Sequence, residues 1–417
     1  MIGPTSYFDP ARAGELDPRT AELVRRRAAA LGPAYRLFYR EPLEFVRGEG
    51  AHLFDADGND YLDAYNNVPS VGHAHPRVVA AIAEQAARLN THTRYLSEPT
   101  VAYAERLLAT MPELGEAHVM FTCTGSEAND LALRIARAAT GATGVLVTSY
   151  AYHGVTAEVA AFSPSLVGPD AVAPWVRLVP PPAPCRDFAA GVRAGIESLA
   201  EAGLRPAALI VDTVFASDGV FPDVPGFADA VDAVRAAGGL FIADEVQPGF
   251  GRLGSGMWGY ARHGLAPDLV TMGKPMGNGH PVAGLAGRAS VVAAFAAQSR
   301  YFNTFGGNTV SIAAASAVLD VLEDEQLIGN AARVGARLAD GIRGMPNVRE
   351  VRGAGLFVGV DLPDEPFTLD VVNALRERRV LLAASGPDNA TLKIRPPLPF
   401  SDADADRLLE ELTAVLR

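Results

Sequence analysis

Asp244 and Lys274 are the side chains of this sequence whose type and position first suggest chemistry. Asp244 ends the apolar run GLFIAD, and Lys274 follows PDLVTMG. A carboxylate at the end of a buried strand is costly unless a cation or a donor meets it, and a protonated ring nitrogen is such a partner. Burial lowers the pKa of a lysine, and only its neutral amine attacks a carbonyl to form an imine. Taken singly, Asp244 is also consistent with an ordinary strand-end acid bonded to a loop amide, and Lys274 with a lysine that reaches solvent.

Two further strand ends carry groups that suit a flat, charged cofactor. In TCTGSEAND a strand stops at Gly125 and Ser126 and a helix begins, so its first amides could bind a phosphate, although Ser126 could also be a simple N-cap. The run VLVTSYAYHG supplies Tyr152 and His153, where an aromatic ring could stack on a cofactor or belong to the core. An imine-forming lysine, an acid, an anion-binding helix start and an aromatic ring are together what a pyridoxal phosphate enzyme requires.

The elements that must position these residues follow from the hydrophobic pattern. From about residue 75 to 307, apolar strand-like runs alternate with alanine-rich helical stretches. This alternation predicts an α/β fold with a mainly parallel sheet covered by helices on both faces. We expect an N-terminal arm and small-lobe segment at 1–70, a large cofactor-binding domain at 71–309 and a smaller α+β domain at 310–417.

Composition narrows the range of partners. The net charge of -12 argues against nucleic acid or an anionic membrane as the main partner, because either needs a basic face. No apolar stretch is long enough for a membrane span, and the start of the sequence lacks the pattern of a secretory signal. Cys123 and Cys185 are too few for a disulfide framework, so we expect reduced thiols and a cytoplasmic protein.

Several segments carry a family resemblance along nearly the whole chain: LFYREPLEFVRGEGAHLFDADGNDYLDA, GSEANDLALRIAR, LFIADEVQPGFGRLGSGMWG, PDLVTMGKPMGNGHPVAG, YFNTFGGNTVSIAAASAVLDV and LKIRPPLPF. The sequence resembles the class III aminotransferases, a fold type I pyridoxal phosphate family that includes ornithine, 4-aminobutyrate and dialkylglycine enzymes. The resemblance implies the cofactor pyridoxal 5'-phosphate, with an amine or amino-acid donor and a keto-acid or aldehyde acceptor as substrates.

The resemblance also implies roles for the cofactor-binding residues. Asp244 pairs with the pyridine nitrogen, Gln247 bonds the ring hydroxyl region and Lys274 forms the imine with the cofactor. The remaining cofactor contacts that it implies are Gly125 and Ser126 around the phosphate, Tyr152 stacked on the ring and His153 close behind it.

Further roles concern the substrate and a second subunit. Thr304 resembles the residue that reaches the neighbouring subunit's phosphate, which implies a homodimer with shared sites. Arg395 resembles the arginine that clamps a substrate carboxylate with its bidentate fork. Tyr39 and Val68 are expected in the wall of the substrate pocket.

Two departures from the family pattern leave the reaction open. Ser217 stands where ornithine and 4-aminobutyrate enzymes carry a glutamate that pairs with the arginine, so Arg395 is expected to stay available. The second departure is a resemblance to one branch of the family, the ethanolamine-phosphate and phosphohydroxylysine phospholyases. The segments that look closest to this branch are YNNVPSVGHAHP, LNTHTRYL and MGKPMGNGHPVAG. Transamination is the first expectation because it dominates the family. A phospholyase, a racemase or epimerase, and a cofactor-binding protein without catalysis are the alternatives.

Overall fold

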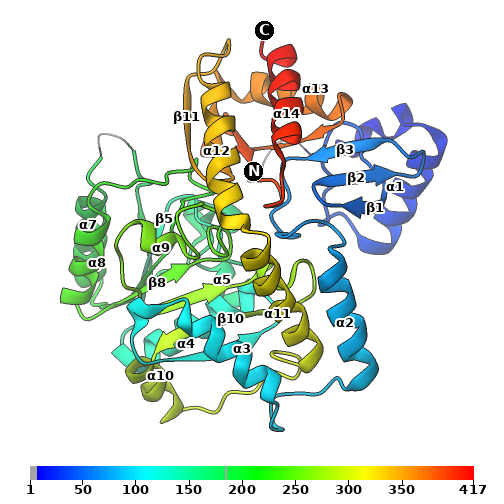
Figure 1. The fold of residues 1–417 in the computed structure, drawn as a ribbon. Coiled ribbons are helices and arrows are strands. Elements are labelled where there is room, and N and C mark those ends of the chain that lie inside the picture. The colour runs from blue at the N-terminus through cyan, green and yellow to red at the C-terminus, as the bar shows by residue number, and fades with distance from the viewer. Residues whose placement is uncertain (1–6, 184–185) are drawn as a thin grey trace.

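A seven-stranded sheet forms the centre of the computed structural model, which describes residues 7–183 and 186–417 (Figure 1). Its order is β4-β10-β9-β8-β7-β5-β6. The strands are β4 (Ala117–Thr122), β5 (Gly144–Thr148), β6 (Val176–Val179), β7 (Pro206–Asp212), β8 (Leu240–Asp244), β9 (Leu269–Met272) and β10 (Ala283–Arg288). The pairs that join β6, β5, β7, β8 and β9 are parallel, whereas β10 is antiparallel to both of its neighbours. The predicted mainly parallel sheet is confirmed, with β10 as the exception.

Helices cover both faces of this sheet, as the side chains of β7 demonstrate. Ala208 and Ile210 pack in a hydrophobic cluster with residues of α4 and α10, whereas Leu209 and Val211 pack in another with residues of α7 and α8. These helices are α4 (Gly125–Thr140), α7 (Phe188–Glu201), α8 (Phe227–Ala236) and α10 (Ala289–Ala296). Because side chains alternate between the faces of a strand, burial on both faces explains why β7 is apolar throughout. In Figure 1, α7 and α8 lie together at the left of the sheet.

Two smaller sheets lie above the large one in Figure 1 and mix segments from the two ends of the chain. One has the order β1-β2-β3-β13, and in it β13 pairs in parallel with β3. The other has the order β11-β12-β15-β14 and is antiparallel. Their strands are β1 (Phe45–Glu49), β2 (His52–Asp55), β3 (Asp60–Asp63), β11 (Glu350–Ala354), β12 (Phe357–Asp361), β13 (Val380–Leu381), β14 (Ala383–Ser385) and β15 (Thr391–Ile394). The predicted N-terminal arm and small-lobe segment therefore joins the C-terminal segment, while the domain boundaries at 70 and 309 stay a prediction.

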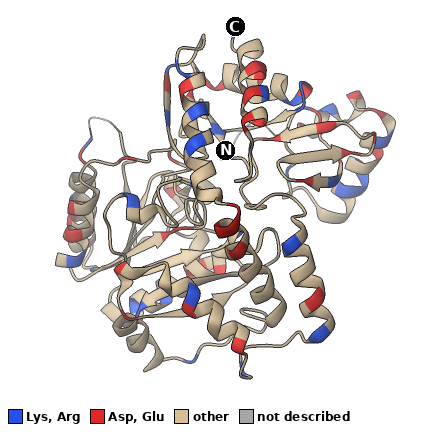
Figure 2. Cartoon of the chain, in the orientation of Figure 1, with Lys and Arg blue, Asp and Glu red and all other residues tan. Residues whose placement is uncertain are grey.

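The remaining longer helices either cover these small sheets or connect them to the large one. They are α1 (Pro18–Leu31), α2 (Pro76–Arg88), α3 (Glu98–Ala109), α11 (Thr309–Asp324), α12 (Leu327–Ile342), α13 (Glu365–Glu377) and α14 (Asp402–Val415). On α12 and α14, basic and acidic side chains lie next to one another, as Figure 2 shows, and Arg333 pairs with Asp402. Within the described ranges no helix combines the length and the apolar character that a membrane crossing needs. Cys185 lies outside the described residues.

Candidate active site

A cavity of about 320 Å³ opens at the carboxyl ends of the central strands. It brings together eight residues predicted from the sequence: Val68, Gly125, Ser126, Tyr152, His153, Asp244, Gln247 and Lys274. Ligands of parallel sheets bind at this edge, so the position agrees with a cofactor site. Tyr39, Thr304 and Arg395 are not among the described residues that line it.

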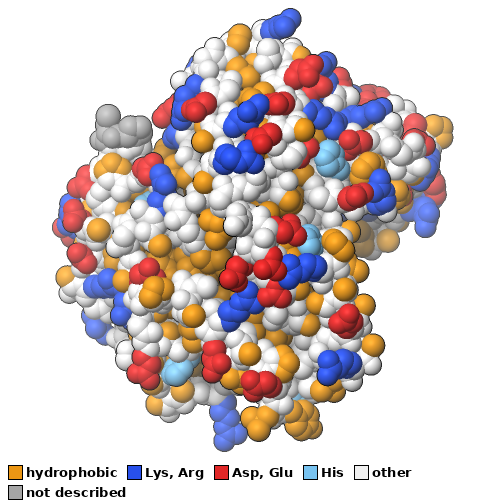
Figure 3. Space-filling model, viewed as in Figure 1, with side chains coloured by type: hydrophobic (Ala, Val, Ile, Leu, Met, Phe, Trp, Pro, Cys, Tyr) orange, Lys and Arg blue, Asp and Glu red, His pale blue; other side chains and the backbone are white. Residues whose placement is uncertain are grey.

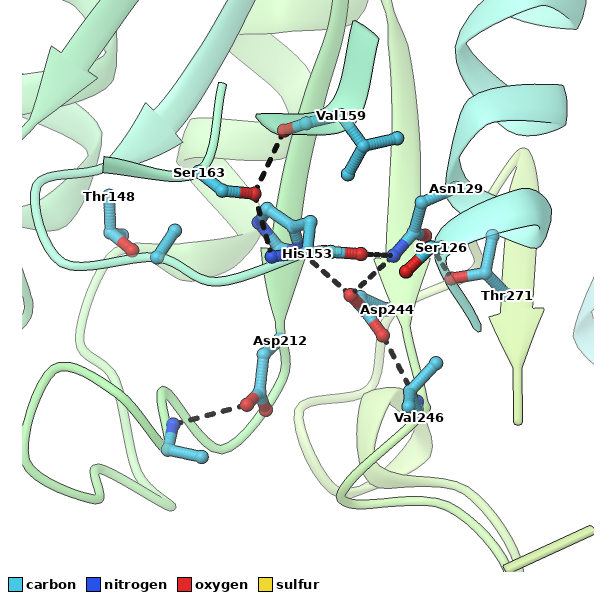
Figure 4. Close-up of polar contacts among 12 residues, drawn as sticks. Ser126, Asn129, Thr148, His153, Val159, Ser163, Asp212, Asp244, Val246 and Thr271 are labelled. Carbon is cyan, nitrogen blue, oxygen red and sulfur yellow. Dashed lines mark hydrogen bonds and ion pairs between the residues drawn. The ribbon is translucent and has the colours of Figure 1, made fainter. Parts of the chain in front are cut away.

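Asp244 is the last residue of β8, and both of its carboxylate oxygens are held in place. Oδ2 accepts hydrogen bonds from Asn129 Nδ2 at 2.9 Å and from His153 Nδ1 at 2.7 Å. Oδ1 accepts one from the amide of Val246 at 3.0 Å. Figure 4 shows these contacts converging on the carboxylate. Because an oxygen can accept more than one hydrogen bond, Oδ1 retains capacity for a further donor such as a protonated ring nitrogen.

Asn129 is a part of this site that the sequence analysis did not single out. Its Nδ2 group also donates to the carbonyl of His153 at 2.8 Å, and its Oδ1 accepts from Thr271 Oγ1 at 2.6 Å. It lies one helical turn after Gly125, on the same face of α4. That spacing from the expected phosphate site is the signal that could have identified it. Asn129 therefore orients both the carboxylate and the loop that carries Tyr152 and His153.

The start of α4 is built to leave its first amides free. Thr124, not Ser126, is the N-cap, and it forms a capping box with Glu127. The hydroxyl of Ser126 instead accepts a hydrogen bond from Val155 N at 3.1 Å. A Cβ atom at Gly154, where φ is +145°, would lie only 2.5 Å from Ser126 Oγ, so this approach requires glycine. The amides of the first helical turn have no partner within the helix and face an anion favourably.

Lys274 lies at the start of the short helix η4 (Lys274–Gly277), directly after β9. Burial lowers the pKa of its amine, and the nearby guanidinium of Arg395 lowers it further, against the opposing effect of Asp244. A lowered pKa increases the fraction of neutral amine, which is the form that can attack a carbonyl or accept a proton. Asp212, which ends β7 and also lines the cavity, has a pKa raised to about 6 by burial and by Asp244.

Arg395 lies immediately behind the cavity wall. Its Nη1 group donates to Asn67 Oδ1 at 2.8 Å and to Oε1 of Gln247, a lining residue, at 2.5 Å. The guanidinium also stacks over the ring of Tyr65 at 4.4 Å. Only 8% of the residue is exposed, its Nε is buried without a partner, and no carboxylate among the described residues pairs with it. Arg395 is therefore held by neutral amides.

Lys393, on β15 two positions before Arg395, is a second cation that the sequence analysis missed. It is 8% exposed, and burial followed by the charge of Arg395 lowers its pKa to about 7. Arg395, two positions further on, contacts Gln247 of the cavity wall, so Lys393 lies near the cavity. The amino-acid composition could have drawn attention to Lys393, because Lys274 and Lys393 are the only lysines in the sequence.

Two other predicted residues lie away from the cavity. Tyr39 is buried, and its hydroxyl donates to the carbonyl of Leu382 at 3.2 Å. Thr304 is exposed in the connection between α10 and α11. Its predicted role concerns a second subunit and stays a prediction.

Comparison with known proteins places this fold and site in a family. The model of class-III aminotransferases matches residues 39–416, so the chain belongs to that family. It is 39% identical to alanine–glyoxylate aminotransferase 2-like of Drosophila melanogaster, over 95% of this chain and 88% of that protein. It is 36% identical to ethanolamine-phosphate phospho-lyase homolog 1 of Caenorhabditis elegans, over 97% and 95% of the two chains. Among solved structures, a phospholyase from Arthrobacter in complex with phosphoethanolamine matches with a TM-score of 0.90 and 42% identity, covering 94% of this chain and 99% of that one.

The chain is thus a pyridoxal-phosphate-dependent enzyme of fold type I, as its sequence predicted. Its own cavity fits the cofactor. Asp244 Oδ1 has room for a ring N–H, the α4 amides suit a phosphate, and Lys274 carries an amine of lowered pKa. The ring of Tyr152, 39% exposed, lines the same cavity and could stack on a flat ring.

Proposed function

We propose that this enzyme is a lyase that releases phosphate from a small phosphorylated amino alcohol of the phosphoethanolamine class. The observation that carries the proposal is a pair of buried cationic residues, Lys393 on β15 and Arg395 directly after it, with no carboxylate partner for either among the described residues. Two positive charges match a phosphate dianion better than a single carboxylate. The 42% identity to a phospholyase that binds phosphoethanolamine supports this choice over the transamination that was expected first.

In this proposal the residues around the cavity have distinct tasks. Pyridoxal phosphate, when bound, supplies an electron sink for the substrate carbon. Asp244 holds a proton at the ring nitrogen, and Lys274 removes the proton from the substrate Cα. Gln247 accepts from Arg395 through Oε1, which leaves its Nε2 group to donate to the ring hydroxyl. The amides of Gly125 and Ser126 bind the cofactor phosphate.

The remaining predicted roles complete the cavity walls. We infer that Tyr152 stacks on the cofactor ring, with His153 behind it holding Asp244. Val68 lines the cavity and would contact the substrate directly. Tyr39 would support the substrate pocket only from behind, since its hydroxyl is committed to Leu382.

Transamination between an amino acid or amine and a keto acid or aldehyde is the second candidate. One support is Arg395, which is bound to neutral amides and could therefore bind a substrate carboxylate. The other support is that some relatives are named as aminotransferases. If carboxylate substrates are transaminated, Arg395→Ala should raise KM steeply for amino acids and barely for simple amines.

The test mixes purified holoenzyme with phosphoethanolamine, phosphohydroxylysine, and alanine with glyoxylate. Inorganic phosphate is assayed, and absorbance records conversion of the cofactor to its amine form. The proposal expects phosphate, ammonia and an aldehyde without accumulation of the amine form. Rapid transamination without any phosphate release would refute it and favour the second candidate.

We further propose a homodimer with shared active sites and a cytoplasmic location. Hydrophobic side chains gather at the lower edge of Figure 3, where Figure 1 places the connection from α2 to α3. In that connection Leu96 is fully exposed and Tyr95 is exposed. Phe302, whose ring contacts that of His92 in the same connection, and Phe305 are exposed as well. An exposed hydrophobic patch of this kind favours burial against another protein surface. Thr304 lies between Phe302 and Phe305 in the sequence and so belongs to the same surface segment. Light scattering should give the mass of a dimer for the wild type and a smaller mass for Leu96→Asp. A monomeric wild type that keeps full activity would contradict the shared site.

A further inference from the structure

Lys393 occupies a position that directs its side chain at the large domain. It pairs across the sheet with Gly359 of β12 and Ala383 of β14, so no bulky side chain flanks it. Alternation along β15 places it on the same face of the sheet as Arg395, which contacts Gln247 of the cavity wall. The loop after β7 packs on this face, since Ser385 Oγ donates to the carbonyl of Ala216 at 3.0 Å.

The ammonium of Lys393 lacks a protein partner in the described part of the chain. No hydrogen bond or ion pair joins it to any residue in the described part of the chain, although the residue is only 8% exposed. Four charged groups act on it: Arg395 from just beyond the end of β15, Asp212 and Asp218 from β7 and the loop after it, and Lys274 from η4. A buried cation is costly unless an anion meets it, so this arrangement calls for an anionic ligand.

Lysine also offers chemistry that arginine cannot. The cations elsewhere in the sequence are all arginines, and lysine occurs only at residues 274 and 393. A guanidinium stays protonated at any relevant pH, whereas a buried ammonium can release its proton. Burial and the charge of Arg395 bring the pKa of Lys393 to about 7, where it can act as an acid near neutral pH. Arg395 is in addition already bound to Asn67 and Gln247.

We propose that Lys393 binds the phosphate of the substrate and donates its proton to the ester oxygen as the carbon–oxygen bond breaks. This inference rests on the proposed lyase function. Lys274 takes the proton from Cα, the electron pair left behind forms the Cα–Cβ double bond, and the Cβ–O pair leaves with the oxygen. The proton of Lys393 converts that leaving oxygen to hydrogen phosphate, which avoids release of a phosphate trianion. Water then reprotonates Lys393.

The first experiment observes Lys393 directly, independently of turnover. Holoenzyme labelled with [ε-13C]lysine should give two lysine signals, and Lys393→Arg assigns them by removing one. Titration should give the Lys393 signal a midpoint near the neutral range, and added sulfate should move that midpoint upward. Sulfate is the probe because its charge is constant across this range. A midpoint near 10, or no response to sulfate, would overturn the inference.

The second experiment separates anion binding from proton donation. Calorimetry with sulfate should show wild-type affinity falling by about tenfold per pH unit above the midpoint. Lys393→Arg should bind sulfate at all pH values, and Lys393→Met should bind it weakly throughout. In phosphate release, Lys393→Arg should keep KM within severalfold but lose most of kcat together with the basic limb of the pH profile. Equal kcat for wild type and Lys393→Arg would exclude proton donation.

The two proposals can fail separately. A wild type that binds sulfate through Lys393 but releases no phosphate would overturn the lyase function and the proton donation, while the anion site would stand. Phosphate release that is unchanged in Lys393→Met would leave the lyase function intact and remove Lys393 from it.

Discussion

Asp244→Asn removes one charge from the cavity while keeping the shape of the side chain. In the wild type, Asp244 accepts hydrogen bonds from Asn129, His153 and Val246. Asparagine has one oxygen, so its amino group must face at least one of these donors. An unsatisfied buried donor costs about 1–3 kcal/mol, and we expect the free energy of unfolding to fall by that amount.

Catalysis should suffer more than stability. Two unit charges 4 Å apart interact by about 4 kcal/mol at an effective dielectric constant of about 20. At about 1.4 kcal/mol per factor of ten, a neutral amide beside the ring nitrogen should lower kcat roughly 1000-fold. The loss should concern kcat rather than cofactor affinity, because the α4 amides and Tyr152 are untouched.

Asp212→Asn is the matched control for Asp244→Asn. Asp212 lies directly opposite Asp244 on the neighbouring strand and lines the same cavity. It has no assigned task at the ring nitrogen, so kcat should fall by less than about tenfold. The assay is kcat at saturating cofactor, with denaturant unfolding measured in parallel. If Asp244→Asn keeps kcat within about tenfold of the wild type, or if Asp212→Asn loses as much, Asp244 does not hold the ring proton.

Three further predictions follow from individual contacts. Lys274→Ala should lose the absorbance of the covalently linked cofactor and all turnover while circular dichroism stays native; retained turnover would remove Lys274 from the mechanism. Gly154→Ala should lower cofactor affinity, measured by fluorescence titration, because its Cβ would lie 2.5 Å from Ser126 Oγ; unchanged affinity would show that the loop shifts freely. Burial raises the pKa of Asp218 from 3.8 to about 7, so the folded state holds this proton more tightly than the unfolded state and stability falls as pH rises through that range. Asp218→Asn should flatten this fall in denaturant unfolding at pH 5 and pH 8, and an unchanged difference would contradict it.

The residues at the ends of strands were predictable because a parallel sheet brings the carboxyl ends of its strands to one edge. Asp244 and Lys274 each follow an apolar run, and the two runs form the adjacent strands β8 and β9. The helix start at Gly125 was predictable for the same reason. Its capping was not, because Thr124 and Ser126 are both good N-caps and only the fold decides between them.

The contacts that join distant segments could not be predicted from one sequence. Arg395 binds Asn67 and Gln247, which lie far from it in the chain, and no local pattern specifies such a pairing. Asn129 likewise acquires its role only when α4 packs against β8 and β9. From the sequence alone Lys393 is an ordinary strand residue, and only the fold shows that the residue is 8% exposed and that its ammonium has no protein partner in the described part of the chain.

The number of proton transfers also distinguishes the two candidate reactions. Transamination moves a proton from the substrate Cα to the cofactor, and a single base, Lys274, can do both parts of that transfer. Elimination of phosphate needs a second proton, delivered to the leaving oxygen on the substrate side of the cavity. The sequence contains two lysines, and burial lowers the pKa of each, while Lys274 also acts electrostatically on Lys393. An arginine at 393 would supply the charge that a carboxylate needs, but it could not supply that second proton. A lysine there is therefore better explained by elimination than by transamination.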